Sequence, residues 1–402
     1  MRRTLAEGRL GREAALREII SPGGDAILET ATREAFGELI ALLREIDARY
    51  LGPEFRIADP ASVVDGHAFA LNLLSAGIDL YLDADPERPR FVSLVSPARK
   101  FLGDNPDAYY FLAPIEGARA YRIRGNISGA VYTSFTFQKS DASGWASEIF
   151  AARNDRELDV ARDGSYELVL ARHRPPGTPD RGFVELVPDA VSVTTRHYFE
   201  NPTCAQLDPT LRVPLSIEPL GRPGPAPPLD DAATATRMRS VVRFVREATL
   251  GMPPRDPAQQ PAWVSTVPNQ LGVPDFYAPT ESAWGAVDNA YSMGPFLLGA
   301  GDALVMEGRL PECCFANVVL WNRFMQSHDY RDRTISRNRR QLKLGHDSSF
   351  RIAIAASDPG IPDWLDTGGR AFGLIFWRFL LPVGPFEPIR TRVVPVGEVA
   401  KI

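Results

Sequence analysis

Apolar positions in the first part of the chain recur every three or four residues, the period of an amphipathic helix. The pattern is clearest over 26–50 and 60–82, and a weaker form covers 5–20. Asp59-Pro60 marks a helix start, because aspartate caps helix N-termini and proline fits the first helical position. The pattern therefore predicts an N-terminal helical segment over residues 1–85.

From Arg90 onward the pattern changes to β-branched and aromatic residues with partial alternation, as in strands. Asp163-Gly164 adds a turn signal typical of hairpins. We expect strands over 109–113, 120–125, 131–137, 165–171 and 190–199. Residues 86–219 are thus predicted to form an antiparallel β-sandwich or jelly roll.

A proline-rich connection over 220–280 separates this region from the rest of the chain. Its first ten residues, LGRPGPAPPL, have the composition of a linker. Asp230-Asp231 can cap a helix over about 231–250, and the loop that follows is long enough to form a lid, a wrap or a functional surface. A second β-sandwich is expected over 281–402.

The second half of the chain repeats the first, which is the main evidence for two sandwiches of similar topology. Four blocks match in the same order: 120–125 with 303–308, 163–171 with 347–355, 183–186 with 364–367, and 194–199 with 376–380. Upstream of them, Asp104, Asn105 and Tyr109 align with Asp288, Asn289 and Tyr291. Single arginines, Arg196 and Arg378, occupy matched places in apolar strands and are interpreted as structural.

Several segments of the second half are similar to a known family. The strings GAVDNAYSMGPF, LPECCFANVVLWNRFMQSHDYRDRTISRN and DPGIPDWLDTGGRAFGLIFWRFLLP resemble the bacterial proteins grouped as domain of unknown function 1214. The resemblance covers roughly 60–395 and implies tandem jelly-roll-like domains, without implying a reaction. Two departures are Asp363, where the family has Asn before the Trp, and 346–349, where it has Asp-Gly.

Composition excludes some classes of function. A net charge of −5 over 402 residues argues against a dedicated nucleic-acid binder. The three cysteines form neither a disulfide framework nor a metal-ligand spacing, and no cofactor signature is present. No apolar run reaches the length of a membrane span, so we expect a cytoplasmic protein that needs no cofactor and no metal.

The densest polar cluster lies at His328, Asp329 and Tyr330, our candidate catalytic residues. Imidazole titrates near neutrality, and a carboxylate and a phenol beside it could complete a general acid–base set. Neighbouring residues in a strand point to opposite faces, so at most half of the cluster can face one site. The alternative is a solvated strand end held by ion pairs, because charged side chains usually lie on the surface.

The candidate substrate-binding residues come from several parts of the second half of the chain. They are Asp288, Asn289 and Tyr291 as a polar rim, Arg333 and Arg339 for an anionic group, and Trp364 for stacking. Each has a structural alternative: a loop turn, an exposed basic turn, or core packing.

Three functions remain open from the sequence. The first is a cofactor-independent lyase or hydrolase acting on a small hydroxylated or anionic organic molecule. The second is a noncatalytic ligand- or glycan-binding protein, in which Trp284, Tyr291 and Trp364 stack on the ligand. The third is an assembly module, a possible homo-oligomer, in which the helices meet a partner. A closed pocket around His328 favours the first, and an uncovered apolar helix face favours the third.

Overall fold

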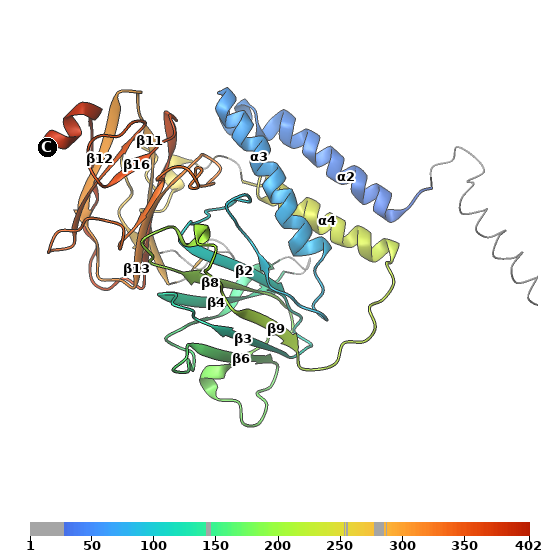
Figure 1. The fold of residues 1–402 in the computed structure, drawn as a ribbon. Helices are drawn as coiled ribbons and strands as arrows, with labels where there is room; N and C mark the ends of the chain where they lie inside the picture. The colour runs from blue at the N-terminus through green and yellow to red at the C-terminus, as the bar shows by residue number, and fades with distance from the viewer. Residues whose placement is uncertain (1–27, 142–145, 253, 255, 277–284, 287) are drawn as a thin grey trace, which may run out of the picture.

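The computed structural model describes residues 28–141, 146–252, 254, 256–276, 285–286 and 288–402. Two β-sandwiches lie next to each other, and a group of helices packs against them (Figure 1). The prediction of a mainly β fold with two tandem sandwiches of similar topology is confirmed. The helix predicted over 5–20 and the side chain of Trp284 lie outside the described residues.

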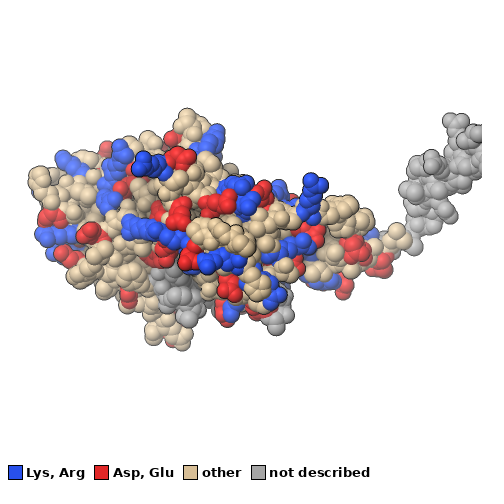
Figure 2. Space-filling model, turned by 90° about the horizontal axis from the view of Figure 1, so that it is seen from below, with Lys and Arg blue, Asp and Glu red and all other residues tan. Residues whose placement is uncertain are grey.

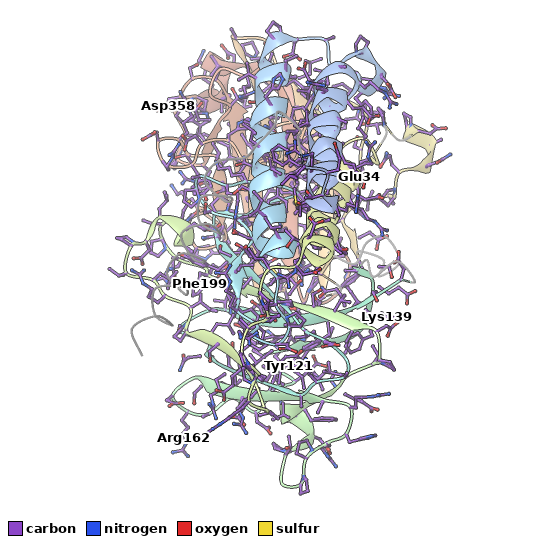
Figure 3. All side chains as sticks on the ribbon, turned by 90° about the vertical axis from the view of Figure 1, so that its right-hand side faces the viewer. Glu34, Tyr121, Lys139, Arg162, Phe199 and Asp358 are labelled. Atoms are coloured by element: carbon purple, nitrogen blue, oxygen red, sulfur yellow. The ribbon has the colours of Figure 1, made fainter. Side chains whose placement is uncertain are left out.

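The first sandwich consists of two sheets whose facing side chains form its core. The five-stranded sheet has the order β1 (Val92–Ser93), β2 (Ala108–Pro114), β8 (Ala190–Tyr198), β4 (Tyr132–Ser140) and β5 (Ala146–Asn154). The four-stranded sheet has the order β7 (Phe183–Glu185), β6 (Ser165–Ala171), β3 (Tyr121–Asn126) and β9 (Leu215–Pro219). Tyr121, labelled in Figure 3, is fully buried there.

The second sandwich repeats this arrangement strand for strand. Its five-stranded sheet has the order β10 (Asp275–Phe276), β11 (Asn289–Leu297), β17 (Phe372–Leu380), β13 (Phe315–Trp321) and β14 (Ser336–Asn338). Its four-stranded sheet has the order β16 (Trp364–Asp366), β15 (Ser349–Ala355), β12 (Asp302–Arg309) and β18 (Arg390–Pro395). Even the unusual parallel pair recurs, β6 with β7 and β15 with β16.

Strand register corrects one detail of the predicted repeat. Arg196 of β8 pairs with Tyr110 of β2, and Arg378 of β17 pairs with Tyr291 of β11. Tyr110 is therefore the counterpart of Tyr291, and the alignment of Tyr109 with it is wrong by one residue. By the same register Asp107, which precedes β2, corresponds to Asp288, which precedes β11. The predicted matches of Asp104 with Asp288 and of Asn105 with Asn289 are therefore also wrong, by three residues each.

Three helices form a layer beside the sandwiches: α2 (Ala31–Glu45), α3 (Pro60–Gly77) and α4 (Asp231–Glu247). The predicted helix start is confirmed, since the Asp59 side chain accepts a hydrogen bond from the Ser62 backbone N–H at 2.8 Å. One turn of π-helix extends α2 and another extends α3. Shorter helical turns are η1 (Ile46–Tyr50), η2 (Pro53–Phe55), η3 (Ile78–Leu82), η4 (Asp180–Gly182), η5 (Ala205–Leu207), η6 (Pro257–Gln259) and η7 (Val396–Lys401).

The long connection before the second sandwich runs along strand β11. The Met293 backbone N–H donates to Trp263 O at 2.7 Å, and the Gly272 N–H donates to Met293 O at 3.1 Å. At Gly294 the two backbones approach so closely that a Cβ would lie 1.9 Å from Gln270 O. Of the three roles that the sequence left open for this connection, its described part therefore forms a wrap.

Candidate functional site

A row of polar residues crosses each five-stranded sheet on the face turned towards the other sandwich. The register pairs the members of each row directly across neighbouring strands. We call the two rows, with the aspartates that precede them, the polar layer: Asp107, Tyr110, Arg196, Ser134 and Asn154 from the first sandwich, and Asp288, Tyr291, Arg378, Asn317 and Asn338 from the second.

The aspartates of the polar layer make reciprocal contacts between the sandwiches. The Asn338 side chain donates from Nδ2 to Asp107 Oδ1 at 3.1 Å. The Asn154 side chain donates from Nδ2 to Asp288 Oδ2 at 3.2 Å, and the Tyr132 hydroxyl donates to the same oxygen. Each sandwich thus inserts an aspartate into the other, and an approximate twofold relation connects the two contacts.

The arginines follow the same reciprocal rule. Arg378 donates from Nη2 to Gly103 O at 2.6 Å, and Arg196 donates from Nη2 to Gly285 O at 3.1 Å. The sequence offered two solutions for these charges, an outward position or a carboxylate partner. In the structure each guanidinium donates to a backbone carbonyl of the opposite sandwich.

Asp107 is the carboxyl of the layer whose pKa its surroundings raise into the neutral range. Its side chain has no exposed surface, and burial raises the pKa of the carboxyl to about 7. Hydrogen bonds from Asn317, at 3.2 Å to Oδ2, and from Asn338 oppose this rise because they stabilise the ionised form. Asp107 can therefore gain or lose a proton near neutral pH, a property common at functional sites.

Arg378 has hydrogen-bonding capacity that its surroundings do not use. Its guanidinium lies 4.5 Å from the ring centroid of Phe376 and 4.9 Å from that of Trp321. Nη1 is buried, and no described residue accepts a hydrogen bond from it. Asn289 Oδ1 and Asn317 Oδ1 are likewise buried, and no described residue donates to either oxygen. Each such atom lowers the free energy of unfolding by about 1–3 kcal/mol when it is buried without a hydrogen-bond partner.

Three tyrosines complete the centre of the layer. The hydroxyls of Tyr110 and Tyr198 lie 3.4 Å apart, and the Tyr291 hydroxyl accepts a hydrogen bond from Asn289 Nδ2 at 3.1 Å. Burial raises the pKa of Tyr291 to about 12 and raises that of Tyr110 as well. The phenols of Tyr110 and Tyr291 are therefore neutral near neutral pH.

The structure places the three candidate catalytic residues in three different surroundings. Burial lowers the pKa of His328 to about 3, and neither ring nitrogen has a hydrogen-bond partner among the described residues. Asp329 forms an ion pair with Arg331 at the surface, which lowers the pKa of its carboxyl to about 2. Tyr330 is buried, with Lys100 Nζ 4.4 Å from its ring centroid. No hydrogen bond joins any two of the three within the described structure.

The six candidate binding residues divide into two groups. Asp288, Asn289 and Tyr291 belong to the polar layer or border it directly. Arg333 forms an ion pair with Asp366 at 2.8 Å, outside the layer.

Arg339 and Trp364 have structural partners as well. Arg339 donates from Nη2 to Glu200 of the first sandwich at 2.8 Å, so it adds an ion pair between the sandwiches. Trp364 donates from Nε1 to Ala355 O at 3.1 Å and packs against the small core beneath η7.

Sequence reasoning missed Asp107 and set aside Arg378. A usable signal was present for Arg378, because a charge in an otherwise apolar strand must find partners inside the fold. Asp107 carried no such signal, since its role depends on an asparagine 231 positions later in the chain.

A shallow surface groove lies at one end of the second sandwich. It comprises two adjoining depressions of about 370 and 580 Å³, which share Gly308, Ser349 and Arg390. One of its cations, Arg309, is already paired with Asp347 at 2.6 Å. Over the face shown in Figure 2, acidic and basic side chains are interspersed. Among the described residues, no group of three or more His, Cys, Asp or Glu side chains is placed to hold a metal ion.

The chain is similar to solved structures of bacterial proteins. An uncharacterized protein from Burkholderia cenocepacia matches with a TM-score of 0.75 and 27% identity, over 90% of this chain and 97% of that one. The VPA0106 protein from Vibrio parahaemolyticus matches with a TM-score of 0.47 and 15% identity, over 82% of this chain and 98% of that one. No protein-family model and no curated protein matches the sequence. The tandem architecture is thus shared with an uncharacterized bacterial protein.

Proposed function

We propose that the protein binds a small anionic or hydroxylated organic molecule in the polar layer between the two sandwiches. The observation that supports this is the set of three buried polar atoms without partners among the described residues: Arg378 Nη1, Asn289 Oδ1 and Asn317 Oδ1. A donor with a positive charge and two carbonyl acceptors suit a carboxylate and a hydroxyl of one small molecule.

The aromatic rings around the Arg378 guanidinium agree with such a ligand. Phe376 and Trp321 lie against the guanidinium of Arg378 and lower the local polarity, which strengthens its attraction for an anion. The phenol of Tyr110 comes from the opposite sandwich. A ligand here would contact both repeats, so both halves of the chain would be needed for affinity.

We extend the proposal to a cofactor-independent lyase or hydrolase reaction, with Asp107 as the group that exchanges a proton. Its pKa of about 7 suits a general acid or base at neutral pH. This role replaces the one that the sequence suggested for His328, because a histidine with a pKa of about 3 is a weak base. Membership of the group with domain of unknown function 1214 and a cytoplasmic location stay predictions from the sequence.

The two related arginines provide a matched experiment. Purified protein is screened by thermal shift against hydroxy acids, dicarboxylates, neutral polyols and amines. We expect an anionic compound to raise the melting temperature of wild type and of Arg196→Met but not of Arg378→Met. Each variant loses a hydrogen bond to a backbone carbonyl of the opposite sandwich, and Nη1 of Arg378 is the atom that has no partner in the described structure. An anion that protects both variants equally would contradict the proposal.

A further inference from the structure

The outward face of helix α3 carries large apolar side chains that the described part of the chain leaves exposed. Val64, Leu71 and Ile78 follow one another at intervals of seven residues, and 69%, 62% and 38% of their surfaces are exposed. A seven-residue repeat keeps apolar side chains on nearly one line along a helix and supplies one of the two apolar positions per heptad through which helices pair.

A second helix, α2, also exposes apolar side chains. In Figure 1 α2 and α3 diverge from the end at which α2 stops and α3 begins, and both pack on α4. On α2 the side chains of Phe36 and Ile40 are 54% and 39% exposed. We call the three residues Val64, Leu71 and Ile78 the apolar helix face. An exposed group of large apolar side chains on a folded protein typically marks an interaction surface.

The opposite face of α3 is already used inside the protein. At Gly66 a Cβ would lie 2.2 Å from Leu51 and 2.9 Å from Phe324. At Gly77 a Cβ would lie 3.1 Å from both Val241 and Phe244 of α4. Helix α3 therefore packs closely on one side, which fixes the direction of the apolar helix face.

The charges that border α3 are already paired within the chain. Asp65 pairs with Arg370, Asp79 pairs with Arg99, and the His67 ring lies 2.9 Å from Asp47. The border therefore has no surplus of cations that would attract an anionic membrane. It also lacks an excess of either charge that would attract an oppositely charged peptide. Two identical copies of such a border can meet without repulsion between like charges.

The segment Pro60–Leu82 is also the one described helix that is long and apolar enough to cross a membrane, a test that core helices of other proteins also pass. Its close packing on Leu51, Phe324 and α4 makes a second copy of the chain the better partner.

We propose that the apolar helix face is the interface of a homodimer in which α3 of one copy packs against α3 of the other. A closed twofold arrangement buries the same surface on both copies. Leu71 lies midway between Val64 and Ile78, so in an antiparallel pair it meets its own counterpart. This assembly is independent of the ligand proposed for the polar layer.

Sedimentation of the full chain over a concentration series tests the proposal. We expect a reversible dimer in wild type, a dissociation constant at least about tenfold higher in Leu71→Glu, and no change in Val383→Glu. Val383 is a matched control, because it is 64% exposed and lies on the second sandwich. Circular dichroism and thermal melts check that each variant is folded, as expected for substitutions at exposed positions.

A cysteine cross-link gives an independent measurement. Leu71→Cys should form an intermolecular disulfide under mild oxidation, whereas Val383→Cys should not. A wild type that sediments as a monomer at every concentration would overturn the proposal, as would a dimer that Leu71→Glu leaves intact. Co-flotation of wild type with phosphatidylglycerol vesicles, lost in Leu71→Glu, would overturn it in favour of a membrane surface.

Discussion

Asp107 and Asp288 occupy the same position in the two sandwiches, one residue before the first long strand, and each accepts a hydrogen bond from an asparagine of the other sandwich. The two bonds are 3.1 and 3.2 Å long. The repeat therefore explains more than two similar folds. It creates a self-complementary polar layer in which each half completes the hydrogen bonds of the other, so we expect the sandwiches to depend on each other for stability.

Replacement of Asp107 should change how stability depends on pH. Burial raises the pKa of this carboxyl to about 7, above the value of about 3.9 for an unfolded aspartate. Between about pH 4 and 7 the folded protein thus binds more protons than the unfolded chain, so wild type loses stability as the pH rises. Asp107→Asn removes this loss, which amounts to at most about 4 kcal/mol.

Urea unfolding at a series of pH values measures this effect. The stability of Asp107→Asn relative to wild type should increase steadily from about pH 4 to 7 and then become constant. If the asparagine also changes the hydrogen bonding, stability shifts by the same amount at every pH, so the dependence of the stability difference on pH is unaffected. A difference that is the same at every pH would show that the carboxyl does not titrate in this window.

His328 should stay neutral throughout the physiological range. Burial lowers the pKa of its imidazole to about 3, and Arg370 and Lys100 disfavour the charged form further. Nuclear magnetic resonance of the ring carbons should show no titration of His328 between about pH 5 and 8, assigned by comparison with His328→Asn. A pKa near the ordinary histidine value of about 6.5 would restore this residue as a candidate general base.

Ser348→Gly should stabilise the protein. Ser348 has a φ of 61°, in the left-handed region, at the position that Gly164 occupies in the first sandwich with a φ of 83°. The left-handed conformation costs a residue with a side chain about 1–2 kcal/mol, so we expect a gain of about 1 kcal/mol in the free energy of unfolding. The reverse change, Gly164→Ser, should destabilise, because its Cβ would also lie 2.8 Å from Asn126 Oδ1. Thermal unfolding measures the change in stability of both variants. The explanation would be refuted if Ser348→Gly and Gly164→Ser changed the stability in the same direction.

Two helix glycines should respond in opposite directions to alanine. A Cβ added at Gly37 of α2 would have no atom within 4 Å, so Gly37→Ala should gain about 0.5–1 kcal/mol from helix propensity. A Cβ added at Gly66 of α3 would lie 2.2 Å from Leu51, so Gly66→Ala should lose about 1–3 kcal/mol through overpacking. Chemical denaturation measures both, and a stabilising Gly66→Ala would show that α3 packs more loosely than described.

The architecture could be predicted because its signals are local. The Asp59-Pro60 helix start and the repeated strand blocks depend on residues close in sequence, and the structure agrees with them. The repeat needed no knowledge of contacts, since matching blocks in order are sufficient.

The candidate site was harder because its contacts join distant residues. Asp107 meets Asn338 across 231 positions, and Arg378 meets Gly103 across 275. The density of polar residues in the sequence instead favoured the segment around His328 as the site. Neighbouring side chains of that segment point in different directions. Asp288, Asn289 and Tyr291 were selected because they lie where the chain enters strand β11. The same position places them at the contact between the sandwiches.

The most direct test of a ligand site in the polar layer is a crystal structure of the protein with the best anionic compound from the thermal-shift screen. We predict that its anionic group lies within hydrogen-bond distance of Arg378 Nη1, with Asn289 or Asn317 as a second contact. A compound bound elsewhere, with Arg378 Nη1 satisfied by an acceptor of the protein itself, would contradict the account.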